Sequence, residues 1–431
     1  MLPMQSTETH SAKTQVYIDL EDQHGAHNYH PLPVVLEKGE GVYVWDVDGK
    51  RYFDFLSAYS AVNQGHGHPK ITAALVKQAQ TLALTSRAFY NNCLGEYEKF
   101  VTEYFGFDKV LPMNTGAEAV ETAIKLCRKW AYEKKGVAEN QAQIIVCEGN
   151  FHGRTTTIVS FSSDPDSNVN FGPYPAGFIS IPYNDNAALE QALQQENVAG
   201  FLVEPIQGEA GVYTPEEDFM RRARALCTQY NALFIADEVQ TGIARTGSLL
   251  AVCGNCSCEQ KCEQQAATYA KPDILILGKA LSGGVYPVSA VLANDDIMMV
   301  IKPGQHGSTF GGNPIAAKVA IAALEVVNEE GLIQNARKLG ALFRQEMQRI
   351  ITTNELILKV RGKGLLNAIV VNDSPDSDTA WRLCLALKEN GLLAKPTHGN
   401  IIRFAPPLVI TDAQLMDCVA IIEKTINTFK K

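Results

Sequence analysis

The chain has 431 residues, of which 46% are hydrophobic and 20% are charged, and its 38 basic and 47 acidic residues give a net charge of −9. This composition is typical of a soluble globular protein with two or more domains. The acidic balance argues against nucleic acid as a partner, and the most apolar helical stretch, residues 315–327, is too short to cross a membrane.

The N-terminal segment bears on the cellular compartment of the protein. Its first fifteen residues lack the apolar core of a signal peptide and the arginines of a mitochondrial presequence. We therefore expect a cytoplasmic protein, with a mature mitochondrial form as the alternative.

The N-terminal region precedes the main alternating pattern. Residues 1–40 are polar, contain prolines and predict an arm that lies over the body of the protein. Residues 41–54 alternate apolar and polar side chains around Val47-Asp48-Gly49, which predicts a β-hairpin.

From about residue 71 onward, predicted strands alternate with predicted helices. The apolar runs at residues 144–147, 200–203, 232–236 and 274–277 predict strands. Strands that alternate with helices favour a mostly parallel sheet that is covered on both faces.

The pattern changes after a predicted helix at residues 315–328. A helix near residues 332–350, a strand near 356–360, an alternating segment at 365–371 and a terminal helix predict a smaller α+β domain. The expected division is an arm and hairpin (1–70) that pack with the small domain, a large domain (71–328) and the small domain (329–431).

The ten cysteines fall into two groups. Six lie singly in predicted core elements and are expected to be small buried side chains: Cys93, Cys127, Cys147, Cys227, Cys384 and Cys418. The other four crowd into one polar loop: Cys253, Cys256, Cys258 and Cys262. Their tight spacing favours redox-active or disulfide-forming thiols over a zinc site, and four solvated thiols are the alternative.

Charged residues stand at the ends of three predicted strands. Glu204, Asp237 and Lys279 come at or just after the ends of the second, third and fourth strands. Ligands of open α/β sheets bind beyond the carboxyl ends of the strands, so these residues can share one site. Singly, either acid is better explained as a helix cap and Lys279 as a strand-end lysine that reaches solvent. Their convergence favours a site.

Lys279 lies in the segment PDILILGKALSGG, residues 272–284. An amine whose surroundings lower its pKa becomes a nucleophile that can form a Schiff base with a carbonyl. A lysine at the end of a buried strand suits that chemistry.

A loop before a predicted helix suits a phosphate group. In MNTGAEA, residues 113–119, Gly116 permits close backbone approach and Thr115 offers a hydroxyl beside the free N–H groups of the helix. Asn114 or Thr115 could also act only as a cap. The loop HGSTFGGNP, residues 306–314, has the same donor-rich character. No dinucleotide fingerprint or P-loop is present, which argues against a nicotinamide enzyme and a nucleotide phosphatase.

These features together describe a site for pyridoxal phosphate. Lys279 would supply the Schiff-base amine, and Asp237 would keep the ring nitrogen protonated. Phe151, in GNFHGR, would stack on the ring.

The motifs resemble those of the class III, fold type I, pyridoxal-phosphate aminotransferases. The resemblance runs from about residue 25 to about residue 412 and includes NTGAEAVETAIKLCRKW, FHGRTTT, VEPIQGEAGV, ADEVQTGIARTG, LILGKALSGGVYPVSAV and HGSTFGGNP. GAHNYHPLPV and LLAKPTHG resemble the members that act on ornithine. The resemblance implies an α/β fold of type I, with a large, mostly parallel sheet flanked by helices and a smaller α+β domain.

The resemblance also implies roles for the residues that bind the cofactor. Lys279 would bind the cofactor and shuttle a proton, Asp237 would hold the ring nitrogen, and Gln240 would hold the phenolic oxygen. The other implied cofactor contacts are Gly116, Ala117, Phe151, Glu204, Ser308 and Thr309. Thr309 would reach the phosphate of a neighbouring subunit, which implies a homodimer.

Five further residues are implied to bind the substrates. Tyr29 and Arg154 would hold the α-amino and α-carboxylate end of ornithine, and Tyr59 would form an aromatic wall. Glu209 and Arg403 would form a switching ion pair. Taken without the resemblance, Tyr59 would be a core aromatic residue and Arg403 a surface charge.

The implied reaction transfers the δ-amino group of L-ornithine to 2-oxoglutarate, giving glutamate and glutamate-5-semialdehyde, which cyclises to pyrroline-5-carboxylate. The alternatives are an aminotransferase for acetylornithine or 4-aminobutyrate, a glutamate-semialdehyde aminomutase, or a scaffold that binds the cofactor without catalysis. No metal is expected, because His66 and His68 have no further clustered ligand nearby in the sequence.

Overall fold

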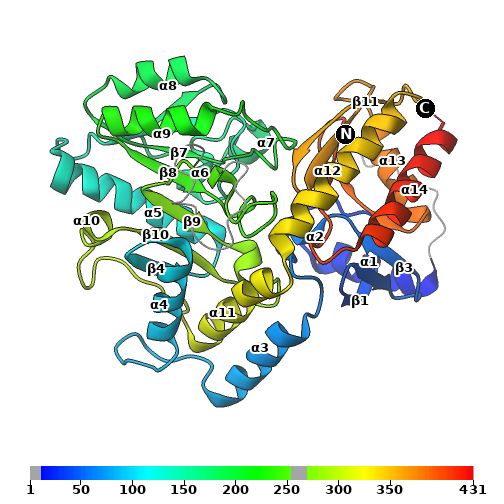
Figure 1. Cartoon of the computed structure of the whole chain (residues 1–431), viewed down its shortest axis with the longest axis horizontal. Coiled ribbons are helices and arrows are strands. Elements are labelled where there is room, and N and C mark those ends of the chain that lie inside the picture. The colour runs from blue at the N-terminus through cyan, green and yellow to red at the C-terminus, as the bar shows by residue number, and fades with distance from the viewer. Residues whose placement is uncertain (1–10, 254–268, 431) are drawn as a thin grey trace.

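The protein is described by a computed structural model over residues 11–253 and 269–430. Figure 1 shows two parts side by side. One contains a large sheet with helices around it, and the other contains the C-terminal elements together with the N-terminal strands. Within the described residues, no helix is long and apolar enough to cross a membrane.

The large part is built on a seven-stranded sheet of order β4-β10-β9-β8-β7-β5-β6. Five neighbouring strands, from β9 to β6, run parallel, whereas β10 is antiparallel to both of its neighbours. The strand bounds are β4 (Lys109–Met113), β5 (Gln143–Cys147), β6 (Phe178–Ile181), β7 (Val198–Val203), β8 (Leu233–Asp237), β9 (Ile274–Leu277) and β10 (Ser289–Ala293). The mostly parallel sheet that the sequence predicted is confirmed.

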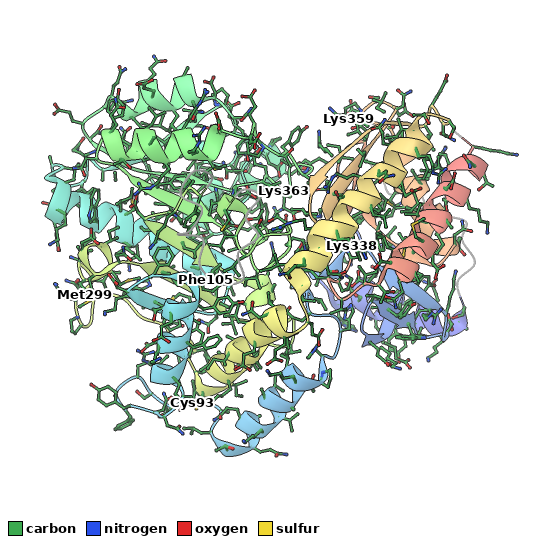
Figure 2. All side chains as sticks on the ribbon, in the orientation of Figure 1. Cys93, Phe105, Met299, Lys338, Lys359 and Lys363 are labelled. Carbon is green, nitrogen blue, oxygen red and sulfur yellow. The ribbon has the colours of Figure 1, made fainter. Side chains whose placement is uncertain are left out.

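Both faces of this sheet are buried, because alternate side chains of each central strand enter different core clusters. In β5, Ile144 and Val146 pack into one cluster, whereas Ile145 and Cys147 pack into the other. The helices of this part supply the other side of each cluster, and side chains fill the space between the ribbons (Figure 2). Their bounds are α3 (Pro69–Thr81), α4 (Leu94–Phe105), α5 (Gly116–Trp130), α6 (Thr156–Val159), α7 (Pro165–Asn168), α8 (Asn186–Leu193), α9 (Phe219–Gln229), α10 (Asp295–Met298) and α11 (Pro314–Glu329).

The second part contains two four-stranded sheets, of orders β1-β2-β3-β13 and β11-β12-β15-β14. Their strands are β1 (Leu36–Glu40), β2 (Tyr43–Asp46), β3 (Arg51–Asp54), β11 (Ile357–Lys363), β12 (Leu366–Val371), β13 (Leu392–Leu393), β14 (Lys395–His398) and β15 (Ile401–Phe404). The helices are α1 (Ala12–His24), α12 (Leu332–Ile351), α13 (Thr379–Glu389) and α14 (Asp412–Thr428).

The predicted hairpin is present as β2 and β3, and β3 pairs in parallel with β13 near the C-terminus. This pairing supports the predicted packing of the N-terminal region on the small domain, although the three domain boundaries stay a prediction. The arm expected over residues 1–40 contains a helix, α1, and a strand, β1, neither of which the sequence indicated.

A left-handed turn follows β3. The four residues of α2 (Ser57–Ser60) have φ angles of 48°, 47°, 61° and 71°. Residues other than glycine rarely adopt this conformation, and a run of four is costly. The carboxylate of Asp54 stabilises the entry by accepting hydrogen bonds from the backbone N–H groups of Leu56 (2.9 Å) and Ser57 (2.8 Å). The turn thereby fixes Tyr59, one of the predicted substrate residues.

The strain of this turn can be measured at Ala58, which is exposed and whose φ angle is 47°. Because glycine adopts a left-handed conformation without steric cost, Ala58→Gly is expected to raise the free energy of unfolding by about 0.5–1 kcal/mol. The control is Ala73→Gly at an exposed site within α3, where glycine is expected to lower that free energy by about 1 kcal/mol. Chemical denaturation of the cofactor-loaded protein would measure both. A loss of stability at Ala58 equal to that at Ala73 would contradict the left-handed turn.

Candidate active site

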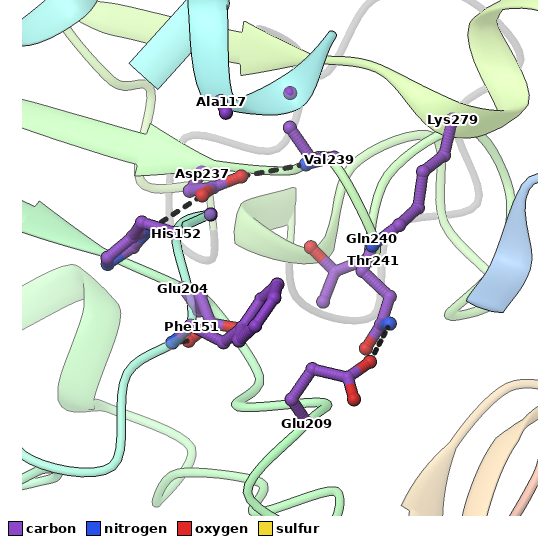
Figure 3. A pocket seen from close by; sticks show the side chains of 12 residues that line it. Ala117, Phe151, His152, Glu204, Glu209, Asp237, Val239, Gln240, Thr241 and Lys279 are labelled. Carbon is purple, nitrogen blue, oxygen red and sulfur yellow. Dashed lines mark hydrogen bonds and ion pairs between the residues drawn. The ribbon is translucent and has the colours of Figure 1, made fainter. Parts of the chain in front are cut away.

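Three strand ends of the large sheet meet at one cavity. Glu204 follows β7, Asp237 ends β8, and Lys279 begins a short 3₁₀ helix, η4 (Lys279–Ser282), just beyond β9. All three line a cavity of about 200 Å³ (Figure 3). The structure thus brings together the charged residues that the sequence indicated at separate strand ends.

Lys279 has an unusual backbone and an altered amine. Its φ angle is 45°, in the left-handed region where residues other than glycine are rare and often functional. Burial lowers the pKa of the Lys279 amine, an effect that nearby Arg403 reinforces and that Glu209, Asp237 and Glu204 oppose. Its side chain extends into the cavity (Figure 3). An amine there with a lowered pKa can act as a nucleophile.

Asp237 has a partner that the sequence analysis did not identify. Its Oδ2 atom lies 2.7 Å from Nδ1 of His152, and its Oδ1 atom accepts a hydrogen bond from the backbone N–H of Val239 at 3.0 Å. Burial opposes a charge on the ring, but the carboxylate of Asp237 outweighs burial and leaves the pKa of His152 raised. His152 directly follows Phe151, yet its sequence position gave no sign of a contact with β8.

Glu204 is buried against the same cavity. Its Oε2 atom accepts a hydrogen bond of 2.9 Å from the backbone N–H of Phe151, so it fixes the segment whose ring was predicted to stack on a cofactor. Burial raises the pKa of Glu204 to about 7, and the neighbouring charges of His152 and Asp237 act in opposite directions.

The N-terminus of α5 forms another wall. Thr115 and Glu118 make a capping box, so the side chain of Thr115 is engaged with the backbone of Glu118. Gly116 and Ala117, the first two residues of α5, line the cavity, and their N–H groups have no acceptor within the helix. A Cβ atom on Gly116 would lie 3.0 Å from Val239, so glycine keeps this wall open.

The ion pair implied by the resemblance is present beside the cavity. Arg403, only 2% exposed, donates a hydrogen bond of 2.6 Å from Nη1 to Oε1 of Glu209. The same oxygen accepts a hydrogen bond of 2.9 Å from Nε2 of Gln240. Burial alone would raise the pKa of Glu209, but Arg403 and Lys279 outweigh it and leave that pKa lowered. Because Arg403 is buried, the alternative of a surface charge is wrong.

Of the other predicted substrate residues, Tyr59 lies beside the ion pair, Arg154 lies beside Phe151, and Tyr29 is exposed. The ring of Tyr59 is 5.2 Å from the guanidinium of Arg403, and its side chain is half-buried. Arg154 lies with its guanidinium 5.6 Å from the ring of Phe151 and donates to the hydroxyl of Ser167 at 3.1 Å. Tyr29 is 69% exposed.

Two predicted cofactor residues do not line this cavity. Ser308 and Thr309 instead line an open pocket with residues 84–87. Asn114, just before the α5 cap, donates a hydrogen bond of 2.8 Å to the hydroxyl of Ser308.

The structure describes the two histidines and the six single cysteines, but only part of the four-cysteine loop. His66 pairs with Asp54 and His68 with Glu330, each at 2.8 Å. The six single cysteines are buried as predicted, and so is Cys253. Three members of the four-cysteine loop (Cys256, Cys258 and Cys262) lie outside the described residues, so the predictions for that loop stay untested. The described ranges contain no group of three or more potential metal ligands from His, Cys, Asp and Glu.

The residues present fit pyridoxal phosphate. Three buried polar atoms near the cavity have no hydrogen-bond partner among the described residues: Nε2 of His152, Oε1 of Gln240 and Nε of Arg403. An unpaired buried polar atom needs an explanation, and a bound polar ligand supplies one for the three atoms at this cavity. The helix N-terminus suits a phosphate, Asp237 suits a protonated ring nitrogen, and Lys279 suits an aldehyde.

Comparisons with known proteins agree with this fit. The sequence model of the family described as Aminotransferase class-III matches residues 24–426. The mitochondrial ornithine aminotransferase of Drosophila melanogaster is 60% identical over 422 residues, which cover 98% of this chain and 94% of the relative.

Solved structures are similar over nearly the whole chain. A structure described as acetylornithine aminotransferase from Elizabethkingia anophelis is 65% identical, with a TM-score of 0.86 and coverage of 96% of this chain and 99% of that one. The ornithine aminotransferase of Toxoplasma gondii is 47% identical, with a TM-score of 0.91 and coverage of 96% and 94%. The chain described here therefore belongs to the class III aminotransferases.

Proposed function

We propose that this enzyme transfers the δ-amino group of L-ornithine to 2-oxoglutarate, giving glutamate-5-semialdehyde, which cyclises to pyrroline-5-carboxylate, and glutamate. The observation that carries the proposal is the buried Glu209–Arg403 ion pair beside Lys279. The names of the fly and Toxoplasma relatives support ornithine as the donor.

The cofactor is pyridoxal phosphate, which when bound supplies an aldehyde that exchanges amino groups and a ring that withdraws electrons from the reacting carbon. Asp237, held by His152, keeps a proton at the ring nitrogen. Gln240 would hold the phenolic oxygen, Phe151 would stack on the ring, and the N–H groups of Gly116 and Ala117 would bind the phosphate.

Lys279 attaches the cofactor and then moves the proton. Because burial lowers the pKa of its amine, Lys279 is more often neutral than an exposed lysine and can accept a proton from the reacting carbon of the substrate. Returning that proton to a different atom would shift the carbon–nitrogen double bond, after which water would release the carbonyl product and leave the amino group on the cofactor.

The ion pair explains how one cavity serves two unlike substrates. An exposed Arg403 would attract the α-carboxylate of ornithine and bring the wrong amine to Lys279. With Glu209 bound to Arg403 that attraction is cancelled, and Tyr29 and Arg154 hold the far end of ornithine. The α-carboxylate of 2-oxoglutarate competes with Glu209 for Arg403, and its second carboxylate takes Arg154.

A homodimer completes the phosphate site under this proposal. Ser308 and Thr309 line a pocket apart from Lys279 on their own chain, so a neighbouring subunit is the better recipient of these donors. Large exposed aromatic side chains in the same two segments, Phe89, Tyr90 and Phe310, support an interface there.

Acetylornithine is the second candidate donor, because the Elizabethkingia structure at 65% identity carries that name. It differs from ornithine by an acyl group on the α-nitrogen, which removes the positive charge there.

A cytoplasmic location stays the prediction, and the mitochondrial name of the fly relative supports the alternative of a mature mitochondrial form.

The donor and the attachment site can be tested with the cofactor-loaded protein. Adding ornithine is expected to change the absorbance of the bound cofactor within one turnover, and more efficiently than adding N-acetylornithine.

The attachment site can be tested by borohydride reduction before substrate is added, which should place the cofactor mass on the peptide that contains Lys279. The Lys279→Arg variant is the control and should lose the label. A label on another lysine would contradict the assigned role.

The ion pair can be tested with Glu209→Ala. This change leaves Arg403 buried and unpaired, so the α-carboxylate of glutamate gains a binding partner worth on the order of 2–5 kcal/mol. The ratio of single-turnover rates with glutamate and with ornithine should rise at least tenfold, about 1.4 kcal/mol. Glu216→Ala, which replaces an exposed glutamate outside the ion pair, serves as the control. An unchanged ratio would show that Glu209 does not select the donor.

A further inference from the structure

The backbone carbonyl of Glu209 is held by two side chains from a different part of the chain. The hydroxyl of Thr397 donates a hydrogen bond to this oxygen, and Nδ1 of His398 lies 2.8 Å from it. A carbonyl oxygen only accepts, so His398 carries a hydrogen on Nδ1. With two donors, both lone pairs of this oxygen are engaged. Thr397 and His398 end β14, within the LLAKPTHG segment, to which the proposed function gives no role.

The strand that holds Glu209 also positions Arg403. β14 pairs with β15, and in this register Lys395 lies opposite Arg403 and His398 opposite Ile401. The backbone of Glu209 and the side chain that it pairs with are therefore both fixed to one hairpin, so the separation of the two charges is set within that hairpin.

The other hydrogen bonds next to Glu209 are made by the loop's own backbone and by Arg403. Gly208, Ala210 and Gly211 surround Glu209, and none has a side chain long enough to anchor the loop. The carbonyl of Gly208 accepts hydrogen bonds of 3.2 Å from the backbone N–H groups of Gly211 and Val212, and one of 3.4 Å from Nη1 of Arg403. Arg361 donates a hydrogen bond of 2.8 Å from Nε to the carbonyl of Gly211, and backbone hydrogen bonds of 3.1 and 3.0 Å join the ends of the loop at Gln207 and Tyr213.

We propose that Thr397 and His398 are positioning residues that determine donor selectivity, because they hold the backbone of Glu209 beside Arg403. With its Cα fixed, Glu209 releases Arg403 only by rotating its side chain, and returns to the same place when the dicarboxylate leaves. Without the two donors the loop relaxes, the carboxylate spends less time on Arg403, and the α-carboxylate of glutamate binds Arg403 more readily, so glutamate reacts faster relative to ornithine. The inference rests on the proposed function of the ion pair.

Paired substitutions separate the hydrogen bonds from the shape of the side chains. Thr397→Val and His398→Phe remove the donors at similar volume, whereas Thr397→Ser and His398→Asn retain a donor. Each donor-free variant should raise the glutamate-to-ornithine ratio of single-turnover rates about fivefold, the factor expected for one neutral hydrogen bond. The donor-retaining variants should restore the wild-type ratio. Thr81→Val is the matched control, because the hydroxyl of Thr81 donates to the carbonyl of Lys77 on α3, outside the cavity lining.

A double-substitution cycle distinguishes loss of the positioning of Glu209 from a general disturbance of the structure. In the Glu209→Ala background the ion pair is already absent, so Thr397→Val should leave the ratio unchanged there. The same fivefold rise in both backgrounds would overturn the inference, as would an unchanged ratio in the wild-type background.

The outcomes also separate this inference from the proposed function. If the wild type does not react with ornithine, or if Glu209→Ala leaves the ratio unchanged, the proposed function fails and this inference fails with it. If Glu209→Ala raises the ratio and the Thr397 and His398 variants do not, only the positioning role is wrong.

Discussion

A buried arginine, Arg245, fixes how the loops of the large sheet meet the C-terminal sheet. It is fully buried, and burial lowers its pKa to about 9. Its Nη1 atom donates to the carbonyls of Leu365 (3.0 Å) and Pro406 (2.6 Å), and its Nε atom donates to Oδ1 of Asn63 at 3.1 Å. Leu365 directly precedes β12 and Pro406 comes two residues after β15, and these strands pair with each other. Arg245 thereby sets where β15, and with it Arg403, reaches the cavity.

Two glutamates beside the cavity show how this placement controls their charge. Burial raises the pKa of Glu204 to about 7, and the charge of His152 and the hydrogen bond from the backbone N–H of Phe151 offset this effect only in part. Glu209 is buried as well, but Arg403 lies within hydrogen-bond distance and the pKa of Glu209 falls. The same residue type is therefore held as an anion in one position and near its titration point in the other, because Arg403 and Lys279 stabilise the charge of Glu209 whereas burial dominates at Glu204.

The sequence predicted the features that depend on local pattern. The apolar runs became β5, β7, β8 and β9, and the strand ends led to the cavity because parallel strands share a carboxyl edge. β10 was missed because its sequence, SAVLA, is short and rich in alanine, and α1 has almost no buried face to give a periodic signal. The contact of His152 with Asp237 and the left-handed turn at residues 57–60 arise from tertiary packing, which no local pattern encodes. The donor-rich loop at residues 306–314 indicated a phosphate contact, but only the resemblance placed Thr309 at the phosphate of a neighbouring subunit.

Under the proposed function, donor selection by a removable ion pair follows from the chemistry of the two substrates. Both ornithine and glutamate have an α-carboxylate, so a permanently exposed arginine could not tell them apart by that group. Breaking a buried ion pair costs about 3–5 kcal/mol unless another anion takes the vacated position. Only a substrate that keeps a second carboxylate for Arg154 can offer its first to Arg403 without losing its hold at the far end. A monocarboxylate such as ornithine gains nothing by displacing Glu209, so selectivity arises from the exchange of anions on Arg403 rather than from the shape of the cavity.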